Sequence, residues 1–182
     1  MESLKLYTIS DAYISYLREF SPKTILRSEG EGYVTSRKYL GVVYEINCYQ
    51  YFAPFSSPKD SDYFLGKNGK KEIRRSIIPI IRMTETFSNG EKGLLATIKL
   101  NNMIPVPVSE LEEYDIDAEP DEKYRGLIQK EMAFVRKNSS LILKNAKVLY
   151  SQKTGGKTTA GYLKSTSDFK LLEQKMDEYK PS

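Results

Sequence analysis

A change in the spacing of apolar residues partway along the chain constrains its fold more than any other feature. Through residues 39–108 the apolar side chains form short runs of strand length, whereas through residues 121–150 they recur every three or four positions, as on a helix face. Strands that follow one another closely in sequence favour antiparallel pairing. The sequence therefore predicts an α+β protein with a compact, strongly bent antiparallel sheet or half-open barrel and helices, in a single domain spanning residues 1–182.

The same patterns place the individual elements. Strands are predicted at residues 4–9, 39–46, 49–52, 77–83, 93–100 and 104–108, and helices at residues 12–20, 121–150 and 169–179. A polar stretch with Gly30 and Gly32 separates the first helix from the second strand and predicts a long loop. Such loops inside a compact domain are more often functional than idle. Tyr33 and Arg37 at the end of this loop are therefore candidate functional residues.

The chain contains no histidine and a single cysteine, Cys48. It therefore lacks the usual general base and the commonest metal ligand, and it cannot form a disulfide within the chain. We expect no metal, no cofactor and a reducing, cytoplasmic location. No apolar run approaches the roughly 18 residues that span a bilayer, and the N-terminus does not resemble a signal peptide, so no membrane association is expected.

Positive and negative charges are segregated along the chain, although the net charge is only +4. Residues 67–75 contain one acid and five cations, namely Lys67, Lys70, Lys71, Arg74 and Arg75. Residues 110–122 contain eight acids and no cation. This pattern favours one face that binds a polyanion and another that avoids it, although two solvated loops would give the same pattern. The five cations are the candidate RNA-binding residues.

The hexapeptide at residues 54–59, Pro-Phe-Ser-Ser-Pro-Lys, sets two hydroxyls and an ammonium together at the end of a predicted strand pair. These groups suit an anionic substrate, and a phosphodiester is the leading candidate. In RNA the 2′-hydroxyl supplies the nucleophile. A protein without histidine then needs only to align the attack, stabilise charge on the phosphate oxygens and assist the leaving 5′-oxygen.

Five residues are the candidate catalytic groups for such a reaction. Arg37 and Lys59 can stabilise the phosphate charge. Ser56 and Ser57 can donate hydrogen bonds to phosphate oxygens, and Tyr33 can stack on a base or donate a proton. Each also has an ordinary structural alternative, because Ser-Pro turns and solvated surface lysines are common in proteins without any such activity.

Two other functions fit parts of the sequence. A non-catalytic RNA-binding protein on the same scaffold would use residues 67–75 for phosphates and tyrosines for bases. A protein-interaction domain would use the acidic residues 110–122 to bind a basic partner. The RNA-binding protein does not need the serines and lysine of residues 54–59. The protein-interaction domain explains neither the cations of residues 67–75 nor this hexapeptide. A nucleotide-binding loop at residues 156–158 is not supported, because Ser151 stands where its first glycine is required.

Seven segments spread over nearly the whole chain carry a resemblance to a known family. They are residues 6–10 (LYTIS), 13–20 (YISYLREF), 41–46 (GVVYEI), 54–59 (PFSSPK), 100–107 (LNNMIPVP), 134–139 (FVRKNS) and 169–173 (FKLLE). In this order they resemble the toxins of type III toxin–antitoxin systems, the ToxN and AbiQ endoribonucleases. Because the match keeps its order along the chain, it is more specific than any single motif.

The resemblance implies a metal-independent endoribonuclease on the compact barrel shared with MazF-like toxins. It implies cleavage of cellular or phage RNA to leave a 2′,3′-cyclic phosphate, and a role in aborting bacteriophage infection. The implied partner is a small repeated RNA antitoxin that folds as a pseudoknot and inhibits the toxin in a multimeric protein–RNA assembly. The toxin in turn cuts this RNA to unit length.

Carried onto this sequence, the family's active-site positions are Tyr33, Arg37, Ser56, Ser57 and Lys59. The family pattern has lysine at the position of Arg37 and often threonine at that of Ser56. Arginine does not give up a proton at accessible pH. Lys59 is therefore the better candidate for an acid, since lysine with its reference pKa of about 10.4 is protonated at neutral pH.

Overall fold

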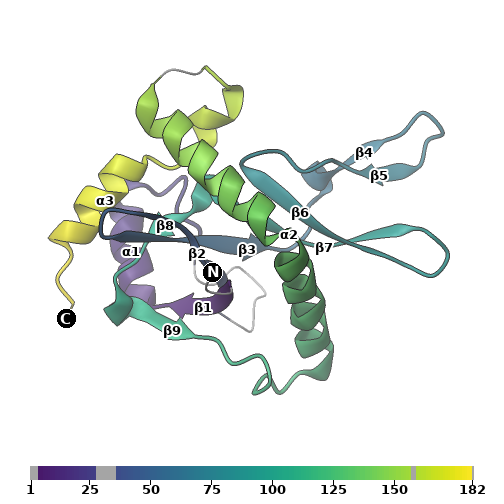
Figure 1. Cartoon of the computed structure of the whole chain (residues 1–182), viewed down its shortest axis with the longest axis horizontal. Coiled ribbons are helices and arrows are strands. Elements are labelled where there is room, and N and C mark those ends of the chain that lie inside the picture. The colour runs from purple at the N-terminus through teal and green to yellow at the C-terminus, as the bar shows by residue number, and fades with distance from the viewer. Residues whose placement is uncertain (1–3, 28–35, 157–158, 182) are drawn as a thin grey trace.

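An antiparallel sheet with two free edges forms the centre of the molecule (Figure 1). The structure, a computed structural model, describes residues 4–27, 36–156 and 159–181. In pairing order the strands are β6 (Ile80–Thr86), β7 (Lys92–Lys99), β3 (Tyr49–Ser56), β2 (Tyr39–Ile46), β1 (Lys5–Ile9) and β9 (Leu111–Glu113), and β8 (Ile104–Pro105) also pairs with β3. The predicted α+β class with an antiparallel sheet is confirmed, and the sheet is not closed.

A separate two-stranded hairpin projects from this sheet (Figure 1). It consists of β4 (Tyr63–Leu65) and β5 (Lys71–Ile73), and Gly69 near its tip has a φ of 72°, a left-handed conformation that favours glycine. The sequence did not predict β4, β5 or β9. Each is only three residues long and carries exposed side chains, so neither length nor apolar alternation distinguishes it from a loop.

Three helices begin at side chains that accept a main-chain N–H of the first turn. They are α1 (Asp11–Phe20), α2 (Glu122–Gly155) and α3 (Phe169–Glu178), capped by Ser10, Asp121 and Asp168 respectively. Short 3-10 turns η1 (Asp60–Asp62), η2 (Leu100–Asn102), η3 (Val108–Glu110) and η4 (Gly161–Ser165) complete the described chain. Within this part of the chain, no helix has the length and apolar character needed to cross a membrane.

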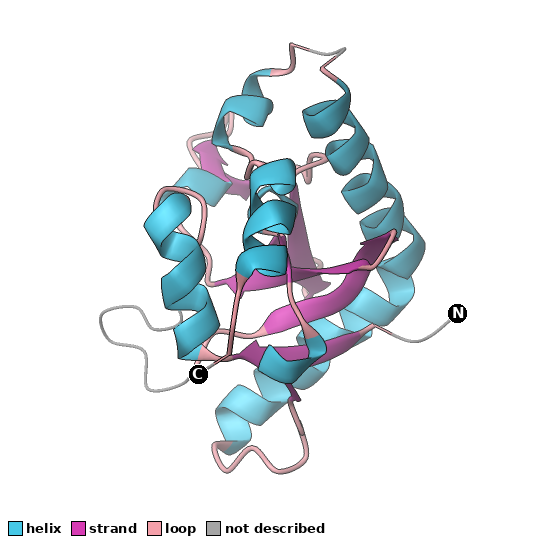
Figure 2. Cartoon of the chain, turned by 90° about the vertical axis from the view of Figure 1, so that its left-hand side faces the viewer, coloured by secondary structure: helices cyan, strands magenta, loops and turns pink. Residues whose placement is uncertain are grey.

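Helices cover both faces of the sheet (Figure 2). Tyr51 and Ala53 of β3 are buried in one core with residues of α2, whereas Phe52 between them is buried in a second core with residues of α1. Side chains of a strand alternate between its faces, so a strand covered on both sides reads as a continuous apolar run. Residues 51–55 of β3, Tyr-Phe-Ala-Pro-Phe, are such a run and are all buried.

A buried carboxylate joins the two later helices to the sheet. Glu173 of α3 accepts hydrogen bonds from the hydroxyls of Tyr51 at 2.8 Å and Tyr150 at 2.6 Å, and from the ammonium of Lys170 at 2.7 Å. Burial alone would raise the pKa of Glu173, but these three donors outweigh it and hold the pKa below its ordinary value. We call these four residues the Glu173 cluster.

Candidate active site

Pairing of three strand ends places two of the candidate residues side by side. The pairing of β2 with β3 continues past the end of β2, because the Phe55 N–H donates to the Lys38 carbonyl at 2.9 Å. The residue before Lys38 is Arg37. Its guanidinium donates to the Phe55 carbonyl at 2.7 Å and to the Ser56 hydroxyl at 3.3 Å. On the opposite side Ser56 pairs with Thr97 of β7. Ser56 therefore lies between Arg37 and β7.

A cavity of about 390 Å³ brings four of the five candidate catalytic residues together. Its lining consists of Leu26, Arg37, Ser56, Ser57, Lys59, Lys99, Asn101 and Asn102. The fifth candidate, Tyr33, lies outside the described residues. The cavity thus joins the loop end before β2, the hexapeptide after β3 and the segment after β7, and we call it the strand-end cavity.

Four lining residues of the strand-end cavity were not predicted as site residues: the apolar Leu26 and the polar Lys99, Asn101 and Asn102. Lys99 ends β7 and lies two residues beyond Thr97, so its side chain emerges on the same face as that of Ser56. Asn101 and Asn102 follow in η2. The segment 100–107 had been recognised by resemblance, but its approach to residues 54–59 depends on β3 pairing with β7, which no local pattern indicates.

The cavity has an unbalanced positive charge. Its three cations, Arg37, Lys59 and Lys99, form no ion pair with any carboxylate among the described residues. Burial lowers the pKa of Lys99 below the ordinary lysine value. Asp62 opposes this effect, whereas the positive charges of Lys59 and Arg82 add to it. An anion entering the cavity would therefore relieve repulsion among groups that the fold already holds together.

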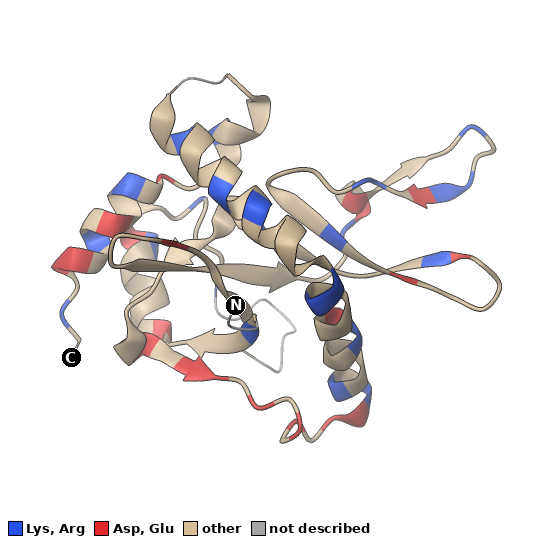
Figure 3. Cartoon of the chain, viewed as in Figure 1, with Lys and Arg blue, Asp and Glu red and all other residues tan. Residues whose placement is uncertain are grey.

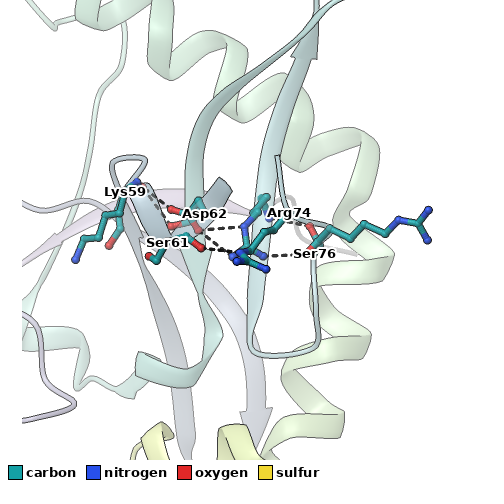
Figure 4. A network of polar contacts seen from close by, with 9 residues as sticks. Lys59, Ser61, Asp62, Arg74 and Ser76 are labelled. Atoms are coloured by element: carbon teal, nitrogen blue, oxygen red, sulfur yellow. Dashed lines mark hydrogen bonds and ion pairs between the residues drawn. The ribbon is translucent and has the colours of Figure 1, made fainter. Parts of the chain in front are cut away.

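Asp62 is itself engaged in a buried ion pair. Its Oδ1 lies 3.0 Å from both Nε and Nη2 of Arg82, and the two side chains are only 2% and 7% exposed. Its Oδ2 accepts the Lys59 N–H at 3.0 Å, and its own N–H donates to the Lys59 carbonyl at 2.9 Å (Figure 4). The turn that carries Lys59 is therefore fixed, while the Lys59 side chain remains exposed.

The five candidate RNA-binding residues lie on the β4–β5 hairpin and just after it, outside the lining of the strand-end cavity (Figure 3). All five are exposed. Lys71 pairs with Asp60 at 3.0 Å and lies 4.5 Å from the centre of the Tyr63 ring. The hairpin is joined to the turn that carries Lys59, because the Arg74 N–H donates to the Asp62 carbonyl at 2.8 Å. The acidic residues 110–122 begin at β9, the opposite edge of the sheet from β6.

Among the described residues there is no group of three or more His, Cys, Asp or Glu side chains that could hold a metal ion. The polar groups that line the strand-end cavity are hydroxyls, amides and cations. A rigid cluster of such groups matches the charge and hydrogen-bonding pattern of a phosphodiester. Fold and site together define a small α+β protein whose cavity suits a phosphate group.

The sequence profile described as "Toxin ToxN, type III toxin-antitoxin system" matches residues 5–177. The chain belongs to this family of toxins, and the predicted resemblance is confirmed. The endoribonuclease ToxN of Pectobacterium atrosepticum is 30% identical over 177 residues, which cover 97% of this chain and 94% of that protein. The endoribonuclease AbiQ of Lactococcus lactis subsp. lactis is 34% identical over 179 residues, covering 97% and 90%.

Solved structures agree with this assignment over the whole length. One, from a bacterial antiviral system regulated by a processed non-coding RNA, has a TM-score of 0.79 and 30% identity, covering 97% of this chain and 99% of the other. Another, from a type III system with selective toxin inhibition by a non-coding RNA pseudoknot, has a TM-score of 0.76 and 28% identity, covering 100% of both chains. The open sheet and its helices are therefore those of the family.

Proposed function

We propose that this chain is a metal-independent endoribonuclease toxin of a type III toxin–antitoxin system, with one domain over residues 1–182. The observation that carries the proposal is the strand-end cavity, in which hydroxyls and three cations converge and no cation is paired with a carboxylate of any described residue. Membership of a family whose relatives are named endoribonucleases supports it. The substrate is cellular or phage RNA.

In the proposed reaction the 2′-hydroxyl of RNA attacks the adjacent phosphorus, and the 5′-oxygen leaves. The products are a 2′,3′-cyclic phosphate and a free 5′-hydroxyl. Arg37 is already oriented by its bonds to Phe55 and Ser56, so its remaining donors can bind a non-bridging oxygen at little cost in side-chain entropy. Ser56 and Ser57 donate to the same phosphate. These contacts stabilise the charge that builds up in the transition state.

Lys59 is the proposed acid for the leaving 5′-oxygen. It is exposed at a turn that the Asp62–Arg82 ion pair fixes, whereas Arg37 cannot give up a proton. Tyr33 stays in the proposal as a group that stacks on a base or donates a proton, on the ground of the resemblance alone. It belongs to the chain just before Arg37, which lines the cavity.

The exposed cations of the β4–β5 hairpin are proposed to bind RNA phosphates that flank the cleaved bond. Lys67, Lys70, Lys71, Arg74 and Arg75 project away from the sheet on an element that is joined through Asp62 to the turn that carries Lys59. Aromatic rings on the same hairpin, Tyr63 and Phe64, offer surfaces for unpaired bases. An RNA strand that leaves the cavity on this side would meet both.

The proposed partner is a repeated RNA antitoxin that folds as a pseudoknot, inhibits the toxin in a multimeric assembly and is cut by it to unit length. Selective inhibition by a non-coding RNA pseudoknot in a relative with this fold supports the proposal. The proposed role is abortive phage infection in the cytoplasm, supported by the relative from an antiviral system. Short tandem repeats and a terminator just upstream of the coding sequence would identify the RNA.

The proposed function is tested with purified protein and RNA in excess chelator. We expect the wild-type protein to cleave and to leave 2′,3′-cyclic phosphate ends, and Lys59→Ala to cleave on the order of 10² to 10³ times more slowly, as when one transition-state donor is removed. Lys92→Ala, at the exposed far end of β7, is the control and should cleave normally. Cleavage that stops in chelator and returns with a divalent ion would reject this mechanism.

A further inference from the structure

Lys99 is the one half-buried amine in the strand-end cavity. Residues two apart on a strand share a face, and a residue diagonal to another across an antiparallel pair lies about 7–8 Å from it. Because Ser56 pairs with Thr97, Lys99 is diagonal to Ser56 and on the same face. Both side chains line the strand-end cavity. A phosphate held by Ser56 in this cavity would therefore lie on the side of the sheet from which the Lys99 side chain extends.

The surroundings of Lys99 disfavour its charged form. Its amine donates no hydrogen bond and forms no ion pair to any other residue that the structure describes. The charged groups that act on it are Asp62 from η1, Lys59 from the adjoining turn and Arg82 from β6. Asp62 acts against the lowering of the Lys99 pKa, while its Oδ1 is held by Nε and Nη2 of Arg82. Burial is the largest influence and lowers the Lys99 pKa, which raises the fraction of neutral amine near neutral pH.

We propose that Lys99 is the general base of the cleavage reaction and accepts the proton of the attacking 2′-hydroxyl. The inference rests on the proposed function. Elimination supports it, because among the described lining residues only the two lysines can both accept and release a proton at accessible pH. The Lys59 side chain is exposed, whereas that of Lys99 is half-buried. Two lysines in unlike surroundings thus divide the roles of base and acid.

The proton balance of the step closes without any further reagent. The 2′-oxygen forms a bond to phosphorus as the proton of the 2′-hydroxyl passes to the neutral Lys99 amine. Lys99 thereby becomes an ammonium. The bond from phosphorus to the 5′-oxygen breaks as the Lys59 ammonium gives that oxygen a proton and becomes a neutral amine. The products are the cyclic phosphate and the 5′-hydroxyl. Water returns a proton to Lys59 and removes one from Lys99 before the next turnover.

Single-turnover cleavage of a synthetic RNA over a range of pH tests the role of Lys99. The wild-type rate should rise with pH and then level off as Lys99 loses its proton. Lys99→Met and Lys99→Arg should both cleave at least about 10²-fold more slowly, the usual loss on removing a general base. In both variants the rate should keep rising with hydroxide concentration where the wild-type rate has levelled. Lys92→Met on the same strand is the matched control.

The Lys99→Arg variant distinguishes a role of Lys99 as a base from a role as a positive charge alone. Arginine keeps the positive charge but cannot accept the proton. A Lys99→Arg protein that cleaves at the wild-type rate would therefore overturn the proposal. Thermal unfolding and RNA affinity of each variant, measured alongside, identify a variant that has simply lost its fold. In that case Lys99→Gln, which is smaller and uncharged, replaces it in the same pH series.

A substrate with sulfur in place of the leaving 5′-oxygen distinguishes the proposed base, Lys99, from the proposed acid, Lys59. Sulfur departs as a thiolate and needs no proton, so this substrate should restore cleavage by Lys59→Ala and leave Lys99→Met slow. Restoration of Lys99→Met instead would assign the acid role to Lys99 and overturn the inference. The proposed function fails separately, since wild-type protein that produced no cyclic-phosphate ends would reject it whatever Lys99 does.

Discussion

The strand-end cavity and the Glu173 cluster are both partly buried groups of charged and polar side chains, but they differ in how their charges are balanced. In the Glu173 cluster one carboxylate receives three donors, so its charge is satisfied inside the protein. In the strand-end cavity three cations face each other without a carboxylate of their own among the described residues. A buried charge that has hydrogen-bond partners inside the protein stabilises the fold. A group of cations without a carboxylate partner instead favours the binding of an external anion.

The largest expected effect is on catalysis in the cavity. Ser57→Ala removes a hydroxyl that is proposed to donate to the phosphate, so the cleavage rate should fall on the order of 10² to 10³-fold. RNA affinity should fall far less, because many phosphate contacts share the binding energy. The free energy of unfolding should stay within about 0.5 kcal/mol of the wild type, as for other surface substitutions. Gel-based assays measure the cleavage rate, and urea denaturation measures the free energy of unfolding. A large loss of stability in Ser57→Ala would contradict the view that the cavity contributes little to the stability of the fold.

The opposite pattern is expected in the Glu173 cluster. Glu173→Gln leaves two buried tyrosine hydroxyls without their charged acceptor, so the protein should lose about 1–3 kcal/mol of stability. The cleavage rate of the folded protein should be unchanged. Lys170→Ala is the control, since its side chain is 58% exposed and its loss should cost less than about 1 kcal/mol. Equal losses from the two substitutions would show that the cluster is only a surface ion pair.

A smaller effect is expected in the acid stability of the same cluster. The pKa of Glu173 is lower in the folded protein than in the unfolded chain, where glutamate has a pKa of about 4.3. Its contribution is therefore complete above that value and is lost as the pH falls through the lower, folded value. In Glu173→Gln the free energy of unfolding should fall less steeply over this acid range. Urea titrations of both proteins at a series of pH values measure the difference, and parallel curves would contradict it.

The smallest effect is expected on the hairpin, where the cations are exposed. Reversing Lys70 and Lys71 to glutamate should weaken RNA binding and reduce the slope of log affinity against log salt by about one for each lost phosphate contact. The charge-matched control reverses Lys164 and Lys180, which are exposed elsewhere. Filter binding at several salt concentrations gives both slopes. An unchanged slope in the hairpin variant would place the RNA on another surface.

Local patterns were enough to predict the main strands and the long helix α2. The five predicted catalytic residues came from two segments, and four of them line one cavity. Lys99 could not be found in this way, because its position beside Ser56 depends on a pairing between residues 41 positions apart. The ion pair of Asp62 with Arg82 likewise joins residues 20 positions apart. Periodicity reports which face of an element is buried, whereas such contacts depend on which elements become neighbours.

The junction at Asp62 has a consequence for how toxins of this type diversify. The β4–β5 hairpin begins just after Asp62, and the chain returns to Asp62 when the hairpin ends, because the Asp62 carbonyl accepts the Arg74 N–H. The Asp62 carboxylate also accepts the Lys59 N–H and so holds the turn that carries Lys59. Both ends of the hairpin are therefore fixed at Asp62, so we expect that its length and side chains can change without displacing Lys59. An exchange of this hairpin would therefore alter the proposed RNA contacts while the turn that carries Lys59 keeps its hydrogen bonds, much as antibody loops vary on a constant scaffold.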